Sequence, residues 1–125
     1  MQYLAMIKFD EAMPFGPPPP ALFEKMGAFA QEGAVNGTLV EQAGLGPSEM
    51  GAIVSLADGS ITATDGPFAE AKELIGGYAV IEVRSKAEAV ELARRLMQVH
   101  LDTWPGWEGS CEVRPILREP ADSGS

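Results

Sequence analysis

Several side chains that can move protons or hold a charged ligand lie near one another in the sequence. One short segment contains Asp65, Glu70, Lys72 and Glu73, and the only histidine is His100. An unperturbed imidazole has a pKa of about 6.5, so it can accept and donate protons near neutral pH. A carboxylate beside it would complete an acid–base pair, and a lysine could hold an anionic substrate. We therefore take Asp65 and His100 as candidate catalytic residues. The candidate substrate-binding residues of this segment are Glu70, Lys72 and Glu73.

Each of these groups also has an ordinary structural explanation. The tripeptide Asp65-Gly66-Pro67 is typical of a turn, in which the Asp bonds nearby backbone amides and the Gly takes a positive φ. The charged residues that follow it fit a solvated edge. A histidine at the C-terminal end of a helix makes a favourable contact with the helix dipole. The sequence leaves the catalytic and the structural interpretation open.

Three more residues are candidates for contact with a substrate: Tyr78, Glu82 and Arg114. Residues 78–83 are otherwise apolar, and strand alternation places Glu82 on the same face as Tyr78. We expect Glu82 to face a shared interior of the protein. In the alternative interpretation, Glu82 forms a buried ion pair with Arg114 on a neighbouring strand, and both charges are satisfied.

The remaining reactive or aromatic residues give weaker indications. Trp104, Trp107 and Phe68 could form a wall for a small ligand, although such residues more often pack in a core or dimer interface. Cys111 has no histidine near it in the sequence, so we do not expect a nucleophile. One cysteine and one histidine cannot make a disulfide or a structural zinc set, and no complete glycine-rich nucleotide loop occurs. We predict no tightly bound metal and no cofactor.

The elements that must position these residues alternate between strands and helices. The predicted strands cover residues 2–9, 38–42, 53–56, 61–64, 78–83 and 110–117. Asp58-Gly59 between two β-prone runs predicts a hairpin. One amphipathic helix is predicted after the proline run, ending near Gly33. A second is opened by a capping box, Ser85 to Glu88, and its predicted apolar stripe is Val90, Ala93, Met97 and His100.

This order predicts an α+β, ferredoxin-like split βαβ fold with one inserted hairpin. Two helices can cover only one face of a four-stranded antiparallel sheet. The strands at 2–9 and 78–83, however, are largely apolar on both faces. A second copy of the chain, packed sheet against sheet, would cover the other face. We therefore predict a homodimer that forms an α/β barrel.

Composition excludes several classes of partner. The chain has 125 residues, enough for one domain, and 9 Lys+Arg against 18 Asp+Glu give a net charge of −9. No cluster of basic residues occurs, so we predict no direct contact with nucleic acid. No apolar run is long enough to cross a membrane, and the N-terminus does not resemble a signal peptide. A cytoplasmic protein with no membrane contact is the expectation.

A family resemblance rests on Asp65-Gly66-Pro67-Phe68, followed by Glu70, Lys72-Glu73 and Gly76-Gly77, and on two later segments, 105–108 and 112–115. These motifs resemble the DGPF branch of the YCII-related family, and the likeness spans nearly the whole chain. We expect one such domain over residues 1–118, and the polar sequence of residues 119–125 predicts a flexible tail. It implies a ferredoxin-like fold that dimerises into an α/β barrel. A His–Asp pair proposed for related proteins has its histidine near the first helix, where residues 21–26 contain none.

Two functional hypotheses follow. The first is a small-molecule-binding homodimer with acid–base chemistry in a cavity between strands. The second is a non-catalytic ligand-binding or regulatory module, because related DGPF domains occur near, or fused to, alternative sigma factors. The sequence does not decide whether the chain is an enzyme, nor which molecule it binds.

Overall fold

The structure is a computed structural model and describes residues 1–68 and 73–118. Its elements, in chain order, are β1 (Gln2–Phe9), α1 (Pro20–Asn36), β2 (Leu39–Gly44), the 3-10 helix η1 (Ser48–Met50), β3 (Ala52–Ala57), β4 (Ser60–Asp65), β5 (Leu74–Glu82), α2 (Lys86–Thr103) and β6 (Ser110–Pro115). All the predicted strands and helices are present. The 3-10 helix was not predicted, and β5 begins earlier than the predicted strand at residues 78–83.

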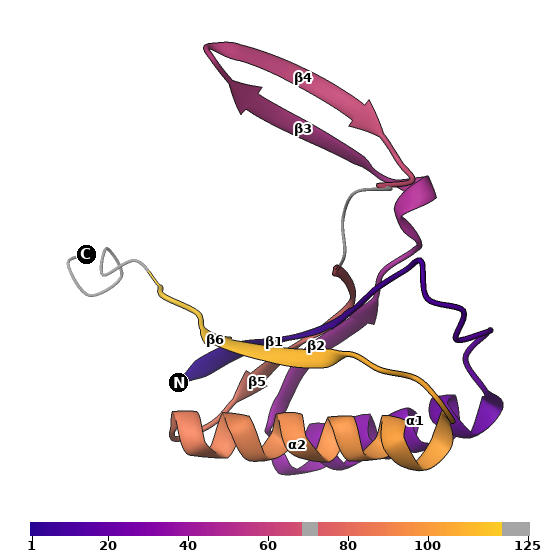
Figure 1. Ribbon diagram of the computed structural model, residues 1–125. Coiled ribbons are helices and arrows are strands. Elements are labelled where there is room, and N and C mark those ends of the chain that lie inside the picture. The colour runs from indigo at the N-terminus through magenta and orange to yellow at the C-terminus, as the bar shows by residue number, and fades with distance from the viewer. Residues whose placement is uncertain (69–72, 119–125) are drawn as a thin grey trace.

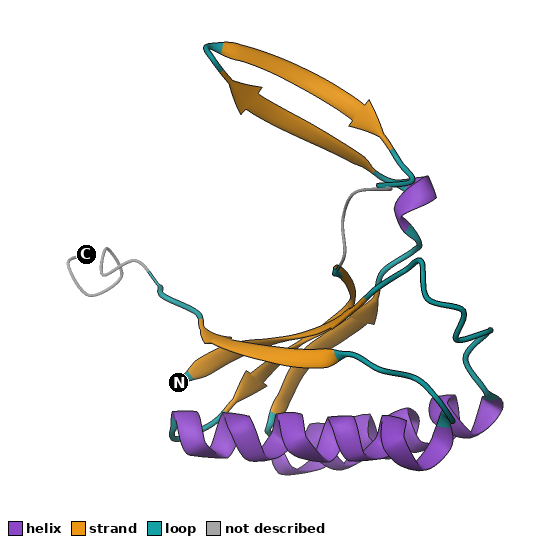
Figure 2. Ribbon diagram, viewed as in Figure 1, coloured by secondary structure: helices purple, strands orange, loops and turns teal. Residues whose placement is uncertain are grey.

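A four-stranded antiparallel sheet forms the body of the molecule. Its strand order is β2-β5-β1-β6, so the first and third strands of the core pair in the centre. Both helices lie on the same side of this sheet, and its other side carries no helix (Figures 1 and 2). The architecture is α+β and is consistent with the predicted ferredoxin-like fold.

The two helices begin and end for identifiable reasons. The Ser85 side chain accepts a hydrogen bond from the backbone N–H of Glu88 at 3.2 Å, which is the predicted N-cap of α2. Helix α1 starts on a proline and ends at Gly37, which has a φ of 81°. The prediction of an end near Gly33 was wrong. Gly33 is buried inside the helix, where a Cβ would lie 2.8 Å from the Cβ of Leu39 on β2, so close packing requires this glycine.

The core lies between the sheet and the helices. Tyr3, Ile81, Val83 and Ala89 form its buried cluster, with Leu39, Ala79, Leu92 and Val113 packed around them. The buried residues of α2 are Ala89, Leu96 and His100. Ala93 lies at helical spacing between Ala89 and Leu96 and lines the same cavity as His100, so these two residues were placed on the stripe correctly. Val90 and Met97 each lie one position away from the buried residues Ala89 and Leu96.

The uncovered face of the sheet is apolar at its centre. Leu4 pairs with Val80 and Met6 pairs with Tyr78 across β1 and β5, and paired residues point to the same side. Since Tyr3 and Ile81 face the helices, these four side chains face away from them. The sequence prediction that one sheet face lacks helices is confirmed. The second copy that would cover it stays a prediction.

The predicted ion pair between Glu82 and Arg114 is wrong. Strand β1 lies between β5 and β6, with Glu82 opposite Gln2 and Arg114 opposite Leu4, so the two side chains are separated by a strand and offset along it. Glu82 is exposed and pairs with the N-terminal ammonium group of Met1. Arg114 instead approaches Glu112, with 3.7 Å between guanidinium nitrogen and carboxylate oxygen.

The inserted hairpin, β3 and β4, stands away from the main sheet as a separate two-stranded ribbon (Figure 1). Asp58 and Gly59 form its turn with φ values of 51° and 74°, as the Asp-Gly sequence predicts. Its register gives it one largely apolar face, made by Val54, Leu56, Ile61 and Ala63, and one polar face. Every residue of both strands is exposed, so nothing described covers the apolar face.

Neither described helix is long and apolar enough to cross a membrane.

Candidate functional site

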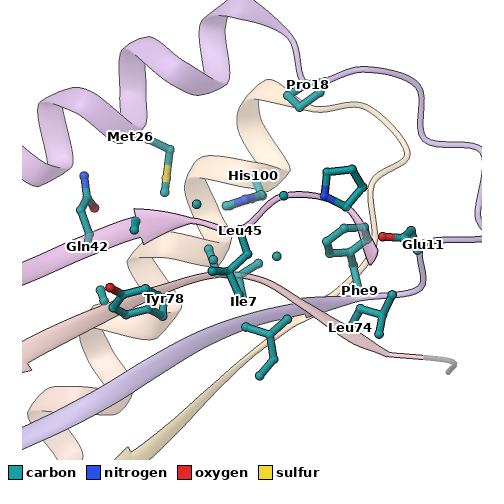
Figure 3. Close-up of a pocket in the computed structure, with 18 of the residues that line it drawn as sticks. Ile7, Phe9, Glu11, Pro18, Met26, Gln42, Leu45, Leu74, Tyr78 and His100 are labelled. Atoms are coloured by element: carbon teal, nitrogen blue, oxygen red, sulfur yellow. The ribbon is translucent and has the colours of Figure 1, made fainter. Parts of the chain in front are cut away.

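A large cavity lies between the helix-covered face of the sheet and the helices, at the end where β1 and β2 leave the sheet. Its volume is about 1270 Å³. The lining includes Ile7 and Phe9 from β1, Met26 from α1, Leu45 after β2, and His100 from α2 (Figure 3). Most lining residues are apolar. Among the described lining residues the charged side chains are Glu11 and Glu73, and none is a lysine or arginine.

His100 is the most reactive group on the wall of this cavity. Its residue is buried, and Nδ1 lies 2.9 Å from the backbone carbonyl oxygen of Leu96, one turn earlier in α2. A carbonyl oxygen only accepts, so Nδ1 carries the hydrogen and, in the neutral ring, Nε2 carries the lone pair. Burial lowers the pKa of His100, and the hydrogen bond to Leu96 opposes that effect only in part. The imidazole is therefore neutral at physiological pH.

The second ring nitrogen is accessible to a ligand or to solvent. Nε2 has no hydrogen-bond partner among the described residues. No buried side-chain nitrogen or oxygen of those residues lacks a partner, so Nε2 is not sealed inside the protein. Since His100 lines the cavity, Nε2 offers it one hydrogen-bond acceptor.

Aromatic rings surround the imidazole. The ring of Trp107 lies 4.5 Å from that of His100, and Trp104 lies 5.9 Å from Trp107 in a stacked arrangement, measured between ring centroids. The Trp104 indole N–H donates to the carbonyl of Phe15 at 3.1 Å, which fixes the ring against the loop after β1. Both tryptophans and Phe68 line the cavity, as the aromatic-wall interpretation of the sequence requires.

A hydrogen-bonded network that the sequence did not reveal holds one side of the cavity. The Glu11 carboxylate accepts hydrogen bonds from the backbone N–H of Ser48 at 2.9 Å and from the Ser48 hydroxyl. The same hydroxyl accepts from the backbone N–H of Phe68 at 3.1 Å. These bonds join the loop after β1, the 3-10 helix and the segment after β4. No local sequence pattern predicts these hydrogen bonds, because Glu11 and Ser48 are far apart in the sequence.

The structure gives Gly66 a different role from the predicted one. Its φ is not among the positive values, which occur at Gly16, Gly37, Gly59 and Gly106. A Cβ at Gly66 would instead lie 1.7 Å from the carbonyl oxygen of Ser48, and its N–H donates to the carbonyl of Gly51 at 2.9 Å. Close backbone contact with the 3-10 helix therefore demands a glycine here.

The predicted site residues divide into four groups. His100, Glu73 and Tyr78 line the cavity, and Glu73 is exposed at its rim. Asp65 lies exposed at the end of β4 and is not among the residues that line this cavity. Glu70 and Lys72 lie outside the described residues. Glu82 and Arg114 belong to the uncovered face of the sheet and lie outside the cavity. Strand alternation directs the Tyr78 side chain to that face as well, so Tyr78 borders the cavity from within β5.

The surroundings of Tyr78 and of Cys111 raise the pKa of each side chain. The Tyr78 hydroxyl donates to the Glu41 carboxylate on β2, and this hydrogen bond raises the pKa of Tyr78. Burial raises the pKa of the Cys111 thiol to about 11, so it is almost wholly protonated at neutral pH. A protonated thiol agrees with the expectation that Cys111 is no nucleophile. Within residues 1–68 and 73–118, no group of three or more His, Cys, Asp or Glu side chains gathers as a metal site would require.

Comparison with known proteins identifies a family and one similar relative. A family model described as the YCII-related domain matches residues 1–118. An uncharacterised protein of Rhizobium meliloti (strain 1021) is 38% identical over 87 residues, which is 69% of this chain. The match spans 66% of that protein's own length, slightly less than two thirds.

Proposed function

This chain belongs to the YCII-related domain family, and from its cavity we infer that it is a small-molecule-binding protein in which His100 accepts a hydrogen bond or a proton from the ligand. The observation that carries the proposal is the orientation of one neutral imidazole in an apolar cavity. The bond from Nδ1 to Leu96 leaves Nε2 as an accessible acceptor on a residue that lines that cavity. Pockets of this kind, mostly apolar with a few directed polar groups, are typical of ligand-binding sites.

The proposal narrows the acid–base hypothesis to His100. Asp65 is exposed at the base of the hairpin and does not line the cavity, so we leave it out of the proposed site. Glu11 lines the cavity, but its carboxylate already accepts two hydrogen bonds from Ser48. Glu73, at the rim, is the described carboxylate best placed to exchange a proton with solvent. The motif Asp65-Gly66-Pro67-Phe68 supports placing the chain in the DGPF branch of the family.

Binding of a neutral aromatic probe tests the cavity proposal. We expect 2-methoxynaphthalene to bind with one molecule per chain in equilibrium dialysis. In Met26→Glu, which places a charge where Met26 reaches into the cavity (Figure 3), binding should weaken at least about tenfold, because a charge in an apolar site is costly. The matched control is Val35→Glu on the same helix, where the side chain is 83% exposed and outside the cavity. Absence of binding by the wild-type protein, or equal losses in both variants, would refute the proposal.

A second proposal concerns the uncovered sheet face. We propose that a second copy of the chain packs against it, because Leu4, Met6, Tyr78 and Val80 form an apolar centre there with nothing described above them. Leaving such a face in water is unfavourable. The apolar face of the hairpin, equally uncovered, adds a second surface that association could bury. The regulatory hypothesis would need a further apolar surface outside this interface.

A further inference from the structure

We propose that the preferred ligands of the cavity are hydroxylated aromatic molecules, uncharged when bound, whose O–H donates to Nε2 of His100 while the ring packs against the aromatic wall. This inference rests on the proposed function and adds the chemical class of the ligand. Three observations support it, one each from the polar, the charged and the apolar parts of the lining.

The polar part of the lining favours a ligand that donates a hydrogen bond. Nδ1 of His100 is engaged with the carbonyl of Leu96 at 2.9 Å, so the free nitrogen of the neutral ring accepts. The ring cannot rotate to reverse these roles without giving up the bond to Leu96. A ligand hydroxyl therefore fits this position, whereas a ligand carbonyl would set two acceptors against each other.

The charged part of the lining opposes anions. Among the lining residues that the structure describes, Glu11 and Glu73 are the charged groups, and no cation accompanies them. Burial lowers the pKa of His100, so the imidazole does not supply a positive charge at neutral pH. The described lining residues offer a carboxylate ligand no counter-charge, and a charge that enters an apolar space unpaired is strongly unfavourable. The sequence-based expectation of an anionic ligand depended on Lys72, which lies outside the described residues.

The apolar part of the lining favours an aromatic ring. The chain contains nine Phe, Tyr and Trp residues, and seven of them line this one cavity. Trp107 lies beside His100 at 4.5 Å between ring centroids, and Trp104 stacks on Trp107. A ring seated near these indoles gains offset or edge-to-face contacts beyond simple burial. The hydroxyl and the ring of a phenol or naphthol can thus be satisfied together.

Three matched naphthalenes separate these requirements. We expect 2-naphthol to bind wild-type protein about three- to tenfold more tightly than 2-methoxynaphthalene in equilibrium dialysis at pH 7.5, the range given by one net hydrogen bond. The anion 2-naphthoate should bind at least about tenfold more weakly than the ether. Equal binding of naphthol and ether, or tightest binding of naphthoate, would overturn the inference while leaving the cavity proposal intact. If the ether fails to bind, the proposed function itself fails.

Variants of His100 assign the preference to its acceptor. In His100→Leu the preference for naphthol over ether should fall to about one, since no acceptor remains. His100→Gln, which restores an acceptor oxygen, should recover part of the preference. An unchanged preference in His100→Leu would show that another group receives the hydroxyl.

A measurement on the wild-type protein avoids dependence on folding of the variants. The chain contains one histidine, so both imidazole ¹⁵N signals belong to His100, and the protonated Nδ1 is distinguished from Nε2 by its chemical shift. Saturation with 2-naphthol should shift the Nε2 signal and leave Nδ1 nearly unmoved, and the ether should shift Nε2 much less. Equal shifts with both ligands would contradict donation to Nε2.

Discussion

His100 is the residue whose surroundings most directly determine how the protein responds to pH. It is buried between α2 and the aromatic wall, and burial is the main reason that its pKa is lowered. An unfolded chain would bind a proton near pH 6.5, whereas the folded chain binds it only at lower pH. Between those two values the unfolded state holds more protons, so the free energy of unfolding falls as the pH falls.

Urea unfolding at several pH values tests this effect. From pH 7.5 down through 6.5 we expect wild-type stability to decrease more steeply than that of His100→Gln, which cannot titrate. The difference in slope should not exceed about 1.4 kcal/mol per pH unit, the value for one proton. Below the folded-state pKa the two slopes should become equal again. Parallel curves for both proteins over pH 5–7.5 would mean that burial does not perturb this imidazole.

At this same scale, the sequence identified some residues of the site by type and missed others. His100, Trp104 and Trp107 were singled out because few residue types offer an imidazole or a large ring, and all three line the cavity. Glu11 and Ser48 were missed, since a hydrogen bond between common polar residues 37 positions apart leaves no local pattern. The expected Glu82–Arg114 pair failed because strand order, not residue type, decides which charges meet.

At the scale of the elements, the close contact between the 3-10 helix and the segment that follows β4 depends on one glycine, Gly66. The Gly66 N–H donates to Gly51, and the Phe68 N–H donates to the Ser48 hydroxyl, so two backbone groups of this segment are held by the 3-10 helix and the residue after it. A side chain at Gly66 would collide with the Ser48 carbonyl, which is backbone and cannot move aside freely. Phe68 and Ser48 both line the cavity, so this contact also shapes the proposed ligand site.

The substitution Gly66→Ala tests that dependence. We expect it to destabilise the protein by about 1–3 kcal/mol, because the added methyl group must displace backbone. Gly27→Ala in α1 is the matched control, since a Cβ there meets nothing within 4 Å and alanine favours a helix. The control should be neutral or slightly stabilising in urea unfolding. Equal midpoints for the two variants would show that the contact with Ser48 relaxes at little cost.

Element boundaries followed from sequence only where the signal was local. Ser85 and Asp58-Gly59 specify a cap and a turn by their own chemistry, and both were found where predicted. Gly33 was misinterpreted as a helix end, because a glycine needed for packing against Leu39 looks the same in sequence as one needed for a positive φ. Val90 and Met97 were predicted one position away from the buried Ala89 and Leu96, since tertiary packing, rather than periodicity alone, chose between adjacent apolar residues.

The described residues present two apolar surfaces that nothing covers, on the sheet and on the hairpin, and the proposed homodimer is tested through the sheet face. Light scattering at micromolar concentration should give twice the 13.2 kDa of one chain. Val80→Arg, which places a charge at the centre of the uncovered sheet face, should give a folded monomer. Val35→Arg, on the exposed side of α1, should stay dimeric. A wild-type monomer, or a Val80→Arg dimer, would exclude association through this face.

The topology of the whole molecule could be predicted from the sequence, because the order of strands and helices restricts a ferredoxin-like chain to few arrangements. The two-faced apolar character of the predicted strands at residues 2–9 and 78–83 correctly indicated that helices cover only one side of the sheet. A cavity between strands was expected, but its location and lining could not be predicted from the sequence, because segments from seven elements and the loops between them bound it. Its existence depends on how far the helices stand from the sheet, which no residue pattern encodes.

Because both tryptophans line the cavity, their fluorescence is a local probe of the cavity wall. Trp104 and Trp107 are the only indoles in the chain, and both stand on the wall of one cavity. Intrinsic fluorescence therefore records events at that wall alone, whereas far-ultraviolet circular dichroism records both helices. During heating, emission that changes before ellipticity would reveal the cavity end opening while α1 and α2 persist. Coincident transitions would instead mark wall and helices as one cooperative unit.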